Sequence, residues 1–368
     1  MVLEIKKIKV MQVISDSNIG GAGKVLLNLL SCFDKSEIDC KVIIPKESKL
    51  KNYVNKIGYE TFEIDGLGEV SFSFDLIKKL TEIFRTEKPD IVHTHASLSA
   101  RIAAKNLKIK TVYTRHWIGN TRTNFALKLI NNYFCDAAIA VSQEVSRSLI
   151  ATGINEKKVK IVHNGVMPLK IYSGIEKKIL KNKYGIENEF VFGVVARLEK
   201  VKGIKYFIDA ASKFLSYSNR NVKFFIFGDG SLKNNFENYV HELRLDKKII
   251  FTGFIENIAE AMNLLDVFVL PSIQEAFPLS LLEAMSVGCA CIATYCGGPT
   301  EIINDRKNGV LVEKRDADAL FSAMKLLYEN GTMREKIGDA AINLVKNNFS
   351  VKEMTNKTIE IYKRLVDF

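Results

Sequence analysis

The sequence predicts an α/β protein with two parallel β-sheets, one in each half of the chain, and helices on both faces of each sheet. Strand-like apolar runs alternate with helical patterns along all 368 residues, and regular alternation of this kind is typical of parallel sheets. The length suggests about two domains. The composition, with 47% hydrophobic and 26% charged residues, is that of a globular protein with a large core.

The expected strands are short apolar runs bounded by turn residues. They lie at residues 9–15, 40–45, 90–96, 110–116 and 137–142 in the first half, and at 190–197, 222–228, 248–253, 266–272, 290–294 and 309–313 in the second. Clear helical patterns lie between them, for example at 23–33, 74–85 and 203–215. The charged, glycine-containing stretch 168–189 is expected to link the two halves. Because open parallel sheets bind ligands at the carboxyl ends of their strands, the segments that follow the strands are the candidate binding loops.

Composition also argues against several classes of protein. No stretch reaches the roughly 18 consecutive apolar residues that a membrane-spanning helix needs, and the N-terminal residues are typical of a first strand and not of a signal peptide. Six cysteines without a CxxC pair fit the reducing cytosol. Cys289, Cys291 and Cys296 lie close together in the sequence. No histidine joins them and their spacing matches no zinc site, so we expect small buried side chains and no metal there.

The net positive charge comes entirely from the first half of the chain. Residues 1–188 hold 30 Lys and Arg against 19 Asp and Glu, and residues 189–368 hold 23 of each, so the first half carries the entire net charge of +11. Such asymmetry suggests that this half meets something anionic, which is a membrane surface, an acidic acceptor or nucleic acid. The alternative is an ordinary lysine-rich solvated surface.

The segment PSIQEAFPLSLLEAM, residues 271–285, places two carboxylates around a turn that is otherwise apolar or small. A buried strand is expected before it, and a helix is expected after it, with Pro278 at the first helical position and Gly288 at the end. Glu275 then falls in the strand-to-helix loop, and Glu283 in the second turn of the helix. The backbone N–H groups of such a helix start can bind phosphate. The alternative is that Glu275 only stabilises the helix dipole and that Glu283 is a solvated surface residue.

Three further loops carry residues suited to a phosphate ligand. Gly20 and Gly21 follow the first strand and let the backbone approach a ligand at the start of a helix, although the pattern is neither a P-loop nor GxGxxG. Arg197 and Lys202 follow the first strand of the second half and suit a diphosphate, with ordinary surface charge as the alternative. The segment TYCGGPTEII, residues 294–303, places two more glycines and a glutamate at another loop-to-helix junction.

Two successive strand ends in the first half carry histidine. His93 and His95 end one strand, and the segment TRHWIGN places Arg115, His116 and Trp117 at the end of the next. A histidine at one strand end is more often structural than catalytic. Histidines at two successive strand ends are less easily explained as structural residues alone.

Taken together, these motifs resemble those of the retaining glycosyltransferases of family 4. The segments GGAG, RLEKVKG, QEAFPLSLLEAM and GGPTE occur in the order found in that family, and the resemblance spans nearly the whole chain. It implies the GT-B fold, in which two Rossmann-like domains face each other across a cleft. Residues 1–167 would form the acceptor domain, with a C-terminal helix at 350–368 packing back on it. Residues 168–349 would form the domain that binds a nucleotide-sugar.

The resemblance also implies roles for individual residues. Glu275 would accept hydrogen bonds from the donor sugar and Glu283 from the ribose, while Arg197 and Lys202 would neutralise the leaving diphosphate. His116 would orient the sugar near its anomeric carbon and would not act as a nucleophile. The other donor-binding candidates are Gly20, Gly21, Phe277, Pro278 and Leu279, and the acceptor-side candidates are His95, Arg115 and Trp117. The loop departs from the family's commoner EGFG form, since Ala276 and Pro278 stand where glycines are usual.

The implied reaction is that of a hexosyltransferase-type enzyme, which moves a sugar from a UDP- or GDP-linked donor to an acceptor hydroxyl with retention of configuration. No pair of aspartates follows a strand where a metal–diphosphate site would need it, and Asp316 and Asp318 fit a helix start, so we expect no metal requirement and no other cofactor. The basic first half favours an acceptor that is lipid-linked or bears phosphate. We expect a cytoplasmic protein, held peripherally at the anionic inner face of the cell membrane, without a nucleic-acid partner.

Other interpretations stay open. A sugar-nucleotide epimerase or a phosphorylase with this fold would turn over without a sugar acceptor, or with phosphate alone. A non-catalytic basic protein that binds membrane or nucleic acid would leave the glutamate, arginine and lysine set without a role. Phe125, Leu129 and Tyr133 recur at helical spacing. They predict either a helix packed on its own domain or an apolar, basic surface that binds anionic lipid.

Overall fold

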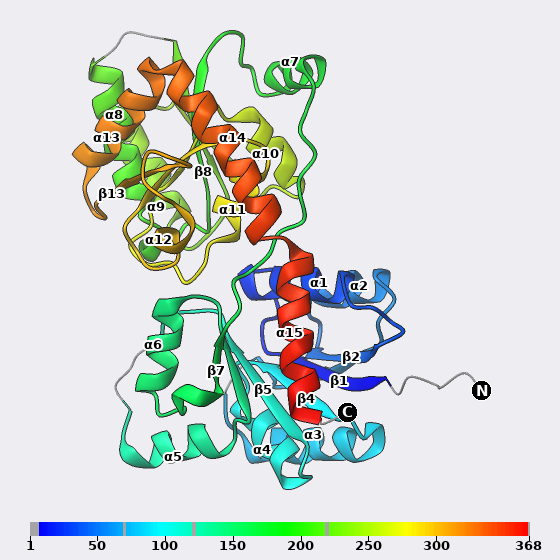
Figure 1. Ribbon diagram of the computed structural model, residues 1–368. Helices are drawn as coiled ribbons and strands as arrows, with labels where there is room; N and C mark the ends of the chain where they lie inside the picture. Colours follow the sequence, from blue (N-terminus) through cyan, green and yellow to red (C-terminus); the bar gives the residue numbers. More distant parts are fainter. Residues whose placement is uncertain (1–6, 69–70, 120–122, 218–220, 367–368) are drawn as a thin grey trace. The chain divides into compact units, whose positions relative to one another are not determined.

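In the computed structural model, residues 7–68, 71–119, 123–217 and 221–366 are described, and the chain divides into two compact units (Figure 1). One unit comprises Met1–Gly165 together with Val351–Phe368, and the other comprises Val166–Ser350. Each unit contains a sheet of parallel strands accompanied by helices. The predicted α/β class, with one parallel sheet in each half, is therefore confirmed.

The first unit holds a seven-stranded sheet in the order β3-β2-β1-β4-β5-β6-β7. Its strands are β1 (Ile8–Ile14), β2 (Ile38–Pro45), β3 (Thr61–Ile64), β4 (Ile91–His95), β5 (Lys110–Arg115), β6 (Ala137–Ala140) and β7 (Val159–Ile161). Its helices are α1 (Gly21–Ser31), α2 (Leu50–Lys56), α3 (Phe74–Glu87), α4 (Leu98–Asn106), α5 (Phe125–Tyr133), α6 (Gln143–Ala151), the short η1 (Glu156–Lys158) and α15 (Val351–Val366). The strand order reverses between β1 and β4, where Gln12 lies opposite His93 and Ile14 opposite His95. Open α/β sheets bind ligands at such a reversal.

The second unit holds a six-stranded sheet in the order β10-β9-β8-β11-β12-β13. Its strands are β8 (Phe190–Val195), β9 (Val222–Phe227), β10 (Ile249–Gly253), β11 (Val267–Leu270), β12 (Ala290–Thr294) and β13 (Val310–Val312). Its helices are α7 (Gly174–Lys183), the short η2 (Lys200–Lys202), α8 (Ile204–Tyr217), α9 (Lys233–Glu242), α10 (Ile258–Leu264), α11 (Leu279–Ser286), α12 (Pro299–Ile302), α13 (Ala317–Glu329) and α14 (Gly331–Asn348). Here the order reverses between β8 and β11, which pair at Phe192 and Val267. The loops after these two strands carry the predicted Lys202 and Glu275.

Two differences from the prediction have local causes. Strands β3 and β7 were not expected, and both are short, partly exposed edge strands that lack a continuous apolar run. The expected linker at 168–189 contains the helix α7. Its start is fixed by a capping box, in which the Ser173 hydroxyl accepts from the Glu176 N–H and the Glu176 carboxylate accepts from the Ser173 N–H. This pattern is a recognisable helix-start signal in the sequence.

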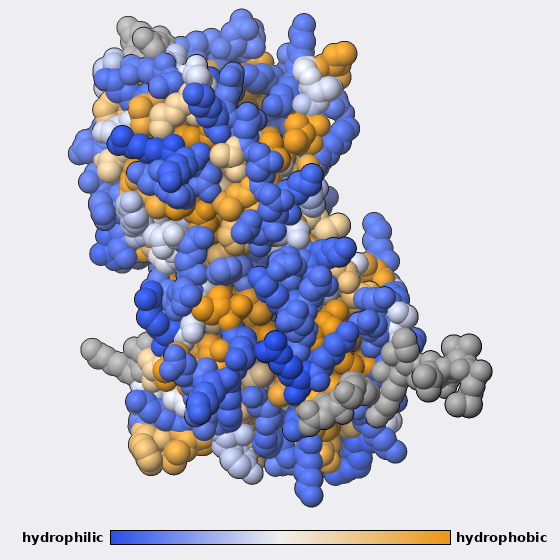
Figure 2. Space-filling model, viewed as in Figure 1, coloured by the Kyte–Doolittle hydropathy of each residue, from blue (hydrophilic) through white to orange (hydrophobic). Residues whose placement is uncertain are grey.

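A helix that spans a membrane must be long and mainly apolar. Among the residues that the structure describes, no helix combines the length and the apolar character that crossing a bilayer requires. Figure 2 shows one face of the protein, on which hydrophilic side chains predominate and hydrophobic ones form small groups.

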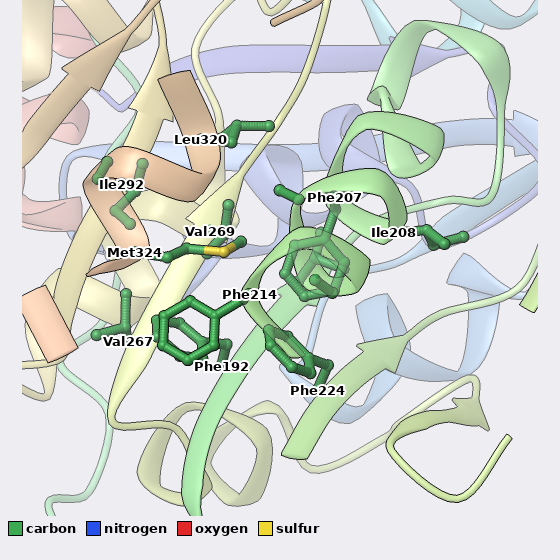
Figure 3. Packing of buried hydrophobic residues seen from close by; sticks show 14 of the residues in the cluster. Phe192, Phe207, Ile208, Phe214, Phe224, Val267, Val269, Ile292, Leu320 and Met324 are labelled. Carbon is green, nitrogen blue, oxygen red and sulfur yellow. The ribbon is translucent and has the colours of Figure 1, made fainter. Parts of the chain in front are cut away.

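An aromatic core fixes the strands of the second unit (Figure 3). The ring of Phe192 on β8 stacks on Phe224 of β9 with centroids 5.4 Å apart, and it meets Phe214 of α8 nearly edge-on at 5.3 Å. Val267 and Val269 of β11 are fully buried in the same cluster. Because aromatic side chains bury large areas in defined geometries, this packing holds β8 and β11 in fixed positions below the loops that follow them.

The C-terminal helix α15 belongs to the first unit, where it contacts α1 and β1 (Figure 1). Its buried face includes Met354, Thr358 and Tyr362, which follow one another at intervals of four residues. Tyr362 has no exposed surface. The last helix of the chain therefore places a phenol hydroxyl beside the first strand.

Candidate active site

A buried ion pair lies at the strand-order reversal of the second unit. Lys202 Nζ is 2.8 Å from Glu275 Oε1, and the Ser272 hydroxyl donates to the same oxygen at 2.7 Å. The side chains of Lys202 and Glu275 are only 18% and 9% exposed. Limited contact with water strengthens such a pair and holds both groups in one geometry. The structure therefore brings together two of the predicted donor-site residues.

Backbone hydrogen bonds join the three loops around this pair. The Glu275 N–H donates to the Cys296 carbonyl at 3.1 Å, and the Gly298 N–H donates to the Glu275 carbonyl at 3.0 Å. The Ile273 N–H donates to the Val201 carbonyl at 2.8 Å. The loop that carries Glu275 is thus tied on one side to the GGPT loop and on the other to the segment that carries Lys202.

Glycines make this close packing of loops possible. A Cβ atom at Gly203, where φ is +66°, would lie 2.0 Å from the Pro271 carbonyl oxygen. At Gly298 it would lie 2.3 Å from the Ala276 carbonyl oxygen. Real Cβ atoms do not approach a backbone oxygen so closely, and positive φ also favours glycine. The glycines of RLEKVKG and GGPTE therefore have a structural role in bringing the loops together.

The helix α11 begins one residue later than predicted. Pro278 is the N-cap, with an extended ψ of 117°, and the helix starts at Leu279, so its assignment to the first helical position was wrong. No described side chain caps this helix start. Its first N–H groups lack intrahelical partners, which suits an anionic ligand. The helix ends before Gly288, where φ is +77°, as predicted.

Glu283 lies in the second turn of α11 and is 8% exposed, as is Glu275. The alternative in which Glu283 is a solvated surface residue is therefore wrong. The side chains of Phe277 and Leu279 are also buried, and the ring of Phe277 packs against Phe349 with centroids 5.5 Å apart. These two side chains belong to the core of the unit.

Arg197 does not join the ion pair. Its side chain is 67% exposed, and Nη1 donates to Glu199 Oε1 at 2.9 Å. An exposed pair of this kind exchanges readily with water and contributes little stability. Arg197 therefore stands near the loop that carries Lys202 but is held only by a weak surface contact.

In the first unit, the glycine loop leads into α1. Gly20 is the N-cap of this helix, Gly21 is its first residue, and no described side chain caps it. A Cβ at Gly21 would meet nothing within 4 Å, whereas one at Gly20 would lie 3.0 Å from Asp16 Oδ2. Crowding inside the unit therefore does not account for Gly21, and its role at a ligand stays a prediction.

The strand-end histidines form part of a buried hydrogen-bonded chain, called the polar chain below, made of Gln12, His93, His95, Thr114, His116 and Tyr362. His116 Nε2 is 2.8 Å from His95 Nδ1, and His95 Nε2 is 3.0 Å from Gln12 Oε1. Gln12 Nε2 donates to the Tyr362 hydroxyl at 2.9 Å. The same hydroxyl is 2.5 Å from His93 Nδ1, and His93 Nε2 is 2.6 Å from Thr114 Oγ1.

Burial keeps the three histidines of the polar chain uncharged. It lowers the pKa of His116 to about 4 and that of His93 to about 3. The pKa of His95 also falls well below its usual value, through burial first and then through the neighbouring rings of His93 and His116. One ring nitrogen, His116 Nδ1, is buried without a hydrogen-bond partner among the described residues. Such orphan atoms are rare in proteins, and each one calls for an explanation such as a bound water, an ion or a ligand.

Sequence reasoning found the histidines of the polar chain but missed Gln12, Thr114 and Tyr362. The sequence gives one indication of Gln12, because it is a polar residue inside the mainly apolar first strand. It gives no indication that Tyr362 contacts Gln12, since the two residues are 350 positions apart.

The other two acceptor-side candidates lie just beyond β5. Arg115 donates to the Tyr113 hydroxyl at 3.2 Å and to Ser148 Oγ at 3.1 Å. Its guanidinium carbon is 5.7 Å from the ring centre of Trp117, which is 45% exposed. The cation and the indole therefore form a partly exposed surface next to His116.

Within the described parts of the chain, no three His, Cys, Asp or Glu residues are grouped as a metal ion would require. Cys289 and Cys291 belong to the buried strand β12 and its approach, and burial raises the pKa of the Cys289 thiol to about 12. Asp316 caps α13 by accepting from the N–H groups of Asp318 and Ala319 at 2.9 Å, so its predicted role at a helix start is confirmed.

Two units that each contain a parallel sheet with helices have the architecture of the GT-B fold. A glycosyltransferase of Rickettsia africae shares this fold with a TM-score of 0.87 and 24% identity, covering 98% of this chain and 99% of that one. HepE of Anabaena, solved in complex with UDP, has a TM-score of 0.85 and 21% identity, covering 97% and 100%. At these identities the likeness shows the fold alone.

Sequence comparison identifies the family. The profile described as "Glycosyltransferase Family 4" matches residues 19–168, and the profile described as "Glycosyl transferases group 1" matches residues 176–344. The chain belongs to the group 1 glycosyltransferases of family 4, so the resemblance of its motifs to that family is confirmed.

Several similar proteins carry the names of specific enzymes. The UDP-Gal:alpha-D-GlcNAc-diphosphoundecaprenol alpha-1,3-galactosyltransferase of Escherichia coli is 27% identical, covering 98% of each chain. The N-acetyl-alpha-D-glucosaminyl L-malate synthase of Bacillus anthracis is 26% identical, covering 79% of this chain and 80% of that one. The alpha-monoglucosyldiacylglycerol synthase of Acholeplasma laidlawii is 27% identical, covering 74% and 76%.

Proposed function

We propose that the protein is a retaining glycosyltransferase that moves a sugar from a nucleotide-diphospho-sugar to an acceptor hydroxyl in the biosynthesis of a cell-surface glycan or glycolipid. The observation that carries this proposal is the Lys202–Glu275 pair. It lies at the strand-order reversal of the second unit, next to the uncapped start of α11. A lysine, a carboxylate and free N–H groups together suit a diphosphate joined to a hydroxyl-rich ring.

In this proposal, the residues of the second unit stabilise the leaving group. Breaking the glycosidic bond moves negative charge onto the diphosphate, and Lys202 with the start of α11 offsets that charge. Arg197 adds a second cation by exchanging its surface contact with Glu199 for a phosphate oxygen. Glu275 accepts hydrogen bonds from sugar hydroxyls and Glu283 from the ribose. Membership of the family suggests that the transferred sugar retains its anomeric configuration.

The names of similar proteins support a UDP-linked donor. HepE was solved with UDP and with UDP-glucose, and the Escherichia coli relative is named for UDP-Gal. The relatives are named as transferases and synthases. That naming does not favour the alternative of an epimerase or a phosphorylase.

A specific surface supports an acceptor held at an anionic membrane. No residue of α5 is buried, and its apolar side chains Phe125, Leu129 and Tyr133 are 76%, 55% and 64% exposed. Residues 101–170, which include this helix, hold twelve Lys and Arg against three Asp and Glu. Figure 2 shows hydrophobic side chains at the lower left, where Figure 1 places α5. Exposed apolar groups within a basic region suit the headgroups of anionic lipid.

The proposal can be tested with a panel of UDP- and GDP-linked sugars. We expect one donor to raise the melting temperature of the protein and to be turned over when a suitable acceptor is present, with the product in the donor's anomeric configuration by NMR. The Glu275→Gln variant serves as a control for the site. A protein that bound no member of the panel, or that converted a donor equally well without an acceptor, would contradict the proposal.

A further inference from the structure

The polar chain has a direction, and the amide of Gln12 sets it. This amide lies in the middle of the chain, with Oε1 facing His95 and Nε2 facing Tyr362. An amide oxygen only accepts hydrogen bonds and an amide nitrogen only donates them. His95 Nε2 must therefore donate a hydrogen to Gln12 Oε1, and the Tyr362 hydroxyl must accept one from Gln12 Nε2.

On the His95 side, the direction fixes two tautomers. A neutral imidazole carries one N–H and one lone pair. Because His95 Nε2 must donate to Gln12, His95 Nδ1 holds the lone pair, and it accepts from His116 Nε2. The hydrogen of His116 is then on Nε2. His116 Nδ1, the buried atom without a partner among the described residues, holds a lone pair.

On the Tyr362 side, the same direction is satisfied without conflict. The Tyr362 hydroxyl accepts from Gln12 and uses its one hydrogen to donate to His93 Nδ1. His93 then carries its hydrogen on Nε2 and donates to Thr114 Oγ1. Burial raises the pKa of Tyr362 well above its usual value and lowers the pKa of His93, so both groups stay neutral.

We propose that Gln12, His95 and Tyr362 are positioning residues that hold His116 in the Nε2–H tautomer, so that its Nδ1 accepts a hydrogen bond from a hydroxyl group of the bound sugar. The identity of the ligand rests on the proposed function, whereas the tautomer rests on the polar chain alone. A buried lone pair without a partner disfavours the empty state, and a hydroxyl that donates to it relieves that cost. A C-terminal residue thereby controls the hydrogen-bonding character of a site residue through Gln12.

The tautomer can be read directly by ¹⁵N NMR of histidine-labelled protein without any substrate, since the chain has five histidines. The His116→Gln variant assigns the His116 signals. We expect Nε2 of His116 to carry the hydrogen and Nδ1 to resonate as a non-protonated nitrogen. A hydrogen on Nδ1 would mean that the chain runs in the opposite direction, and it would overturn the proposal even if the enzyme transferred sugar as proposed.

Two pairs of variants test the positioning residues. Tyr362→Phe removes the partner that orients the Gln12 amide, so the His116 signals should become a mixture of both tautomers and kcat/KM should fall by about tenfold. Tyr59→Phe is the matched control, because Tyr59 is buried in the same unit and donates to the Leu30 carbonyl outside the polar chain. In the second pair, His95→Asn keeps an acceptor for His116 and should retain more activity than His95→Leu. Equal tautomer signals in the two tyrosine variants would overturn the proposal.

Donor analogues test the ligand. A sugar in which one hydroxyl is replaced by hydrogen or by fluorine cannot donate, although fluorine can still accept weakly. At the position that meets His116, both analogues should lose affinity equally, and the His116→Leu variant, which has no acceptor, should no longer distinguish them from the parent. If the fluorinated analogue bound like the parent at every position, the sugar hydroxyl would not be the donor to Nδ1. Absence of any transfer with the tautomer intact would instead refute the proposed function and, with it, the sugar as the ligand.

Discussion

Lys202 Nζ and Glu275 Oε1 lie 2.8 Å apart, although 73 positions separate the two residues in the chain. Lys202 follows β8 and Glu275 follows β11, and these strands are neighbours only because the strand order of the sheet reverses between them. The pair is therefore a direct product of the fold. Since the two groups are already in place, little reorganisation is needed when a charged ligand binds.

Removing either member of this pair should nearly abolish transfer. For Lys202→Ala and for Glu275→Gln, we expect kcat to fall by roughly 10²–10³, the size of effect that the loss of one preorganised electrostatic contact produces. Lys202→Ala should also reduce the free energy of unfolding by about 1–3 kcal/mol, because it leaves a buried carboxylate without its cation. The control is Lys205→Ala, which breaks an exposed pair with Asp209 and should cost under about 1 kcal/mol. Near wild-type turnover by Lys202→Ala would contradict the assignment of Lys202 to the diphosphate.

The packing of the loops predicts a strong effect of a single methyl group. In Gly203→Ala, the new Cβ would lie 2.0 Å from the Pro271 carbonyl oxygen, at a φ of +66°. We expect a loss of about 2–4 kcal/mol in unfolding free energy by urea denaturation, together with loss of transfer as the Glu275 loop moves away. Gly253→Ala has a similar φ of +74° but meets no atom within 4 Å, so it should show only the backbone strain, about 1–2 kcal/mol. Equal losses in the two variants would mean that the contact with Pro271 is unimportant.

The buried histidines predict a loss of stability in mildly acidic solution. In the folded protein, the pKa values of His93 and His116 are about 3 and about 4, whereas histidine in an unfolded chain has a pKa of about 6.5. As the pH falls, the unfolded chain binds these protons first, so the free energy of unfolding should decrease from about pH 6.5 down to about pH 4. Calorimetry at pH 5.5, in buffers of different ionisation enthalpy, should show proton uptake on unfolding. His93→Gln should take up fewer protons at this pH and the same number at pH 8.

Metal removal should leave transfer intact. In the proposed mechanism, Lys202, Arg197 and the start of α11 meet the charge of the diphosphate, so no step depends on Mg²⁺. Initial rates measured in EDTA should equal those measured with added Mg²⁺ or Mn²⁺. A complete loss of activity in EDTA that either ion restores would show that a cation is required and that these residues do not suffice.

The surface of α5 predicts selective binding to anionic vesicles. The full-length protein should co-sediment with vesicles that contain phosphatidylglycerol and should not do so with pure phosphatidylcholine, and binding should weaken as salt screens the charges. Leu129→Gln should reduce this binding. Ile179→Gln is the matched control, since Ile179 is 65% exposed on α7 of the second unit. Equal binding by both variants would show that α5 is not the contact surface.

The sequence was sufficient to predict the central strands of both sheets and the loops that follow them. Central parallel strands are buried on both faces, and their apolar runs stand out against polar surroundings. The edge strands β3 and β7 are partly exposed and only four and three residues long, so no such run marks them. The donor-loop residues could be proposed because the motifs that carry them occur in the order found in the family, although their roles in binding stay predictions.

The polar chain could not be predicted, for a different physical reason. It depends on the side chains of three neighbouring strands and on one turn of α15, and no local pattern relates Gln12 to Tyr362. The exact start of α11 was also missed. Proline fixes its own φ but allows either a helical or an extended ψ, so its presence near a helix start leaves the cap position open by one residue.

The placement of α15 has a consequence for the order in which the two units can complete their folding during synthesis. Residues 166–350 are continuous and leave the ribosome together, whereas the first unit needs α15 to cover α1 and β1. Domains usually fold during synthesis in the order in which they emerge. Here Gln12 is translated 350 residues before its hydrogen-bond partner Tyr362. The domain whose synthesis begins first is therefore the last one to be completed.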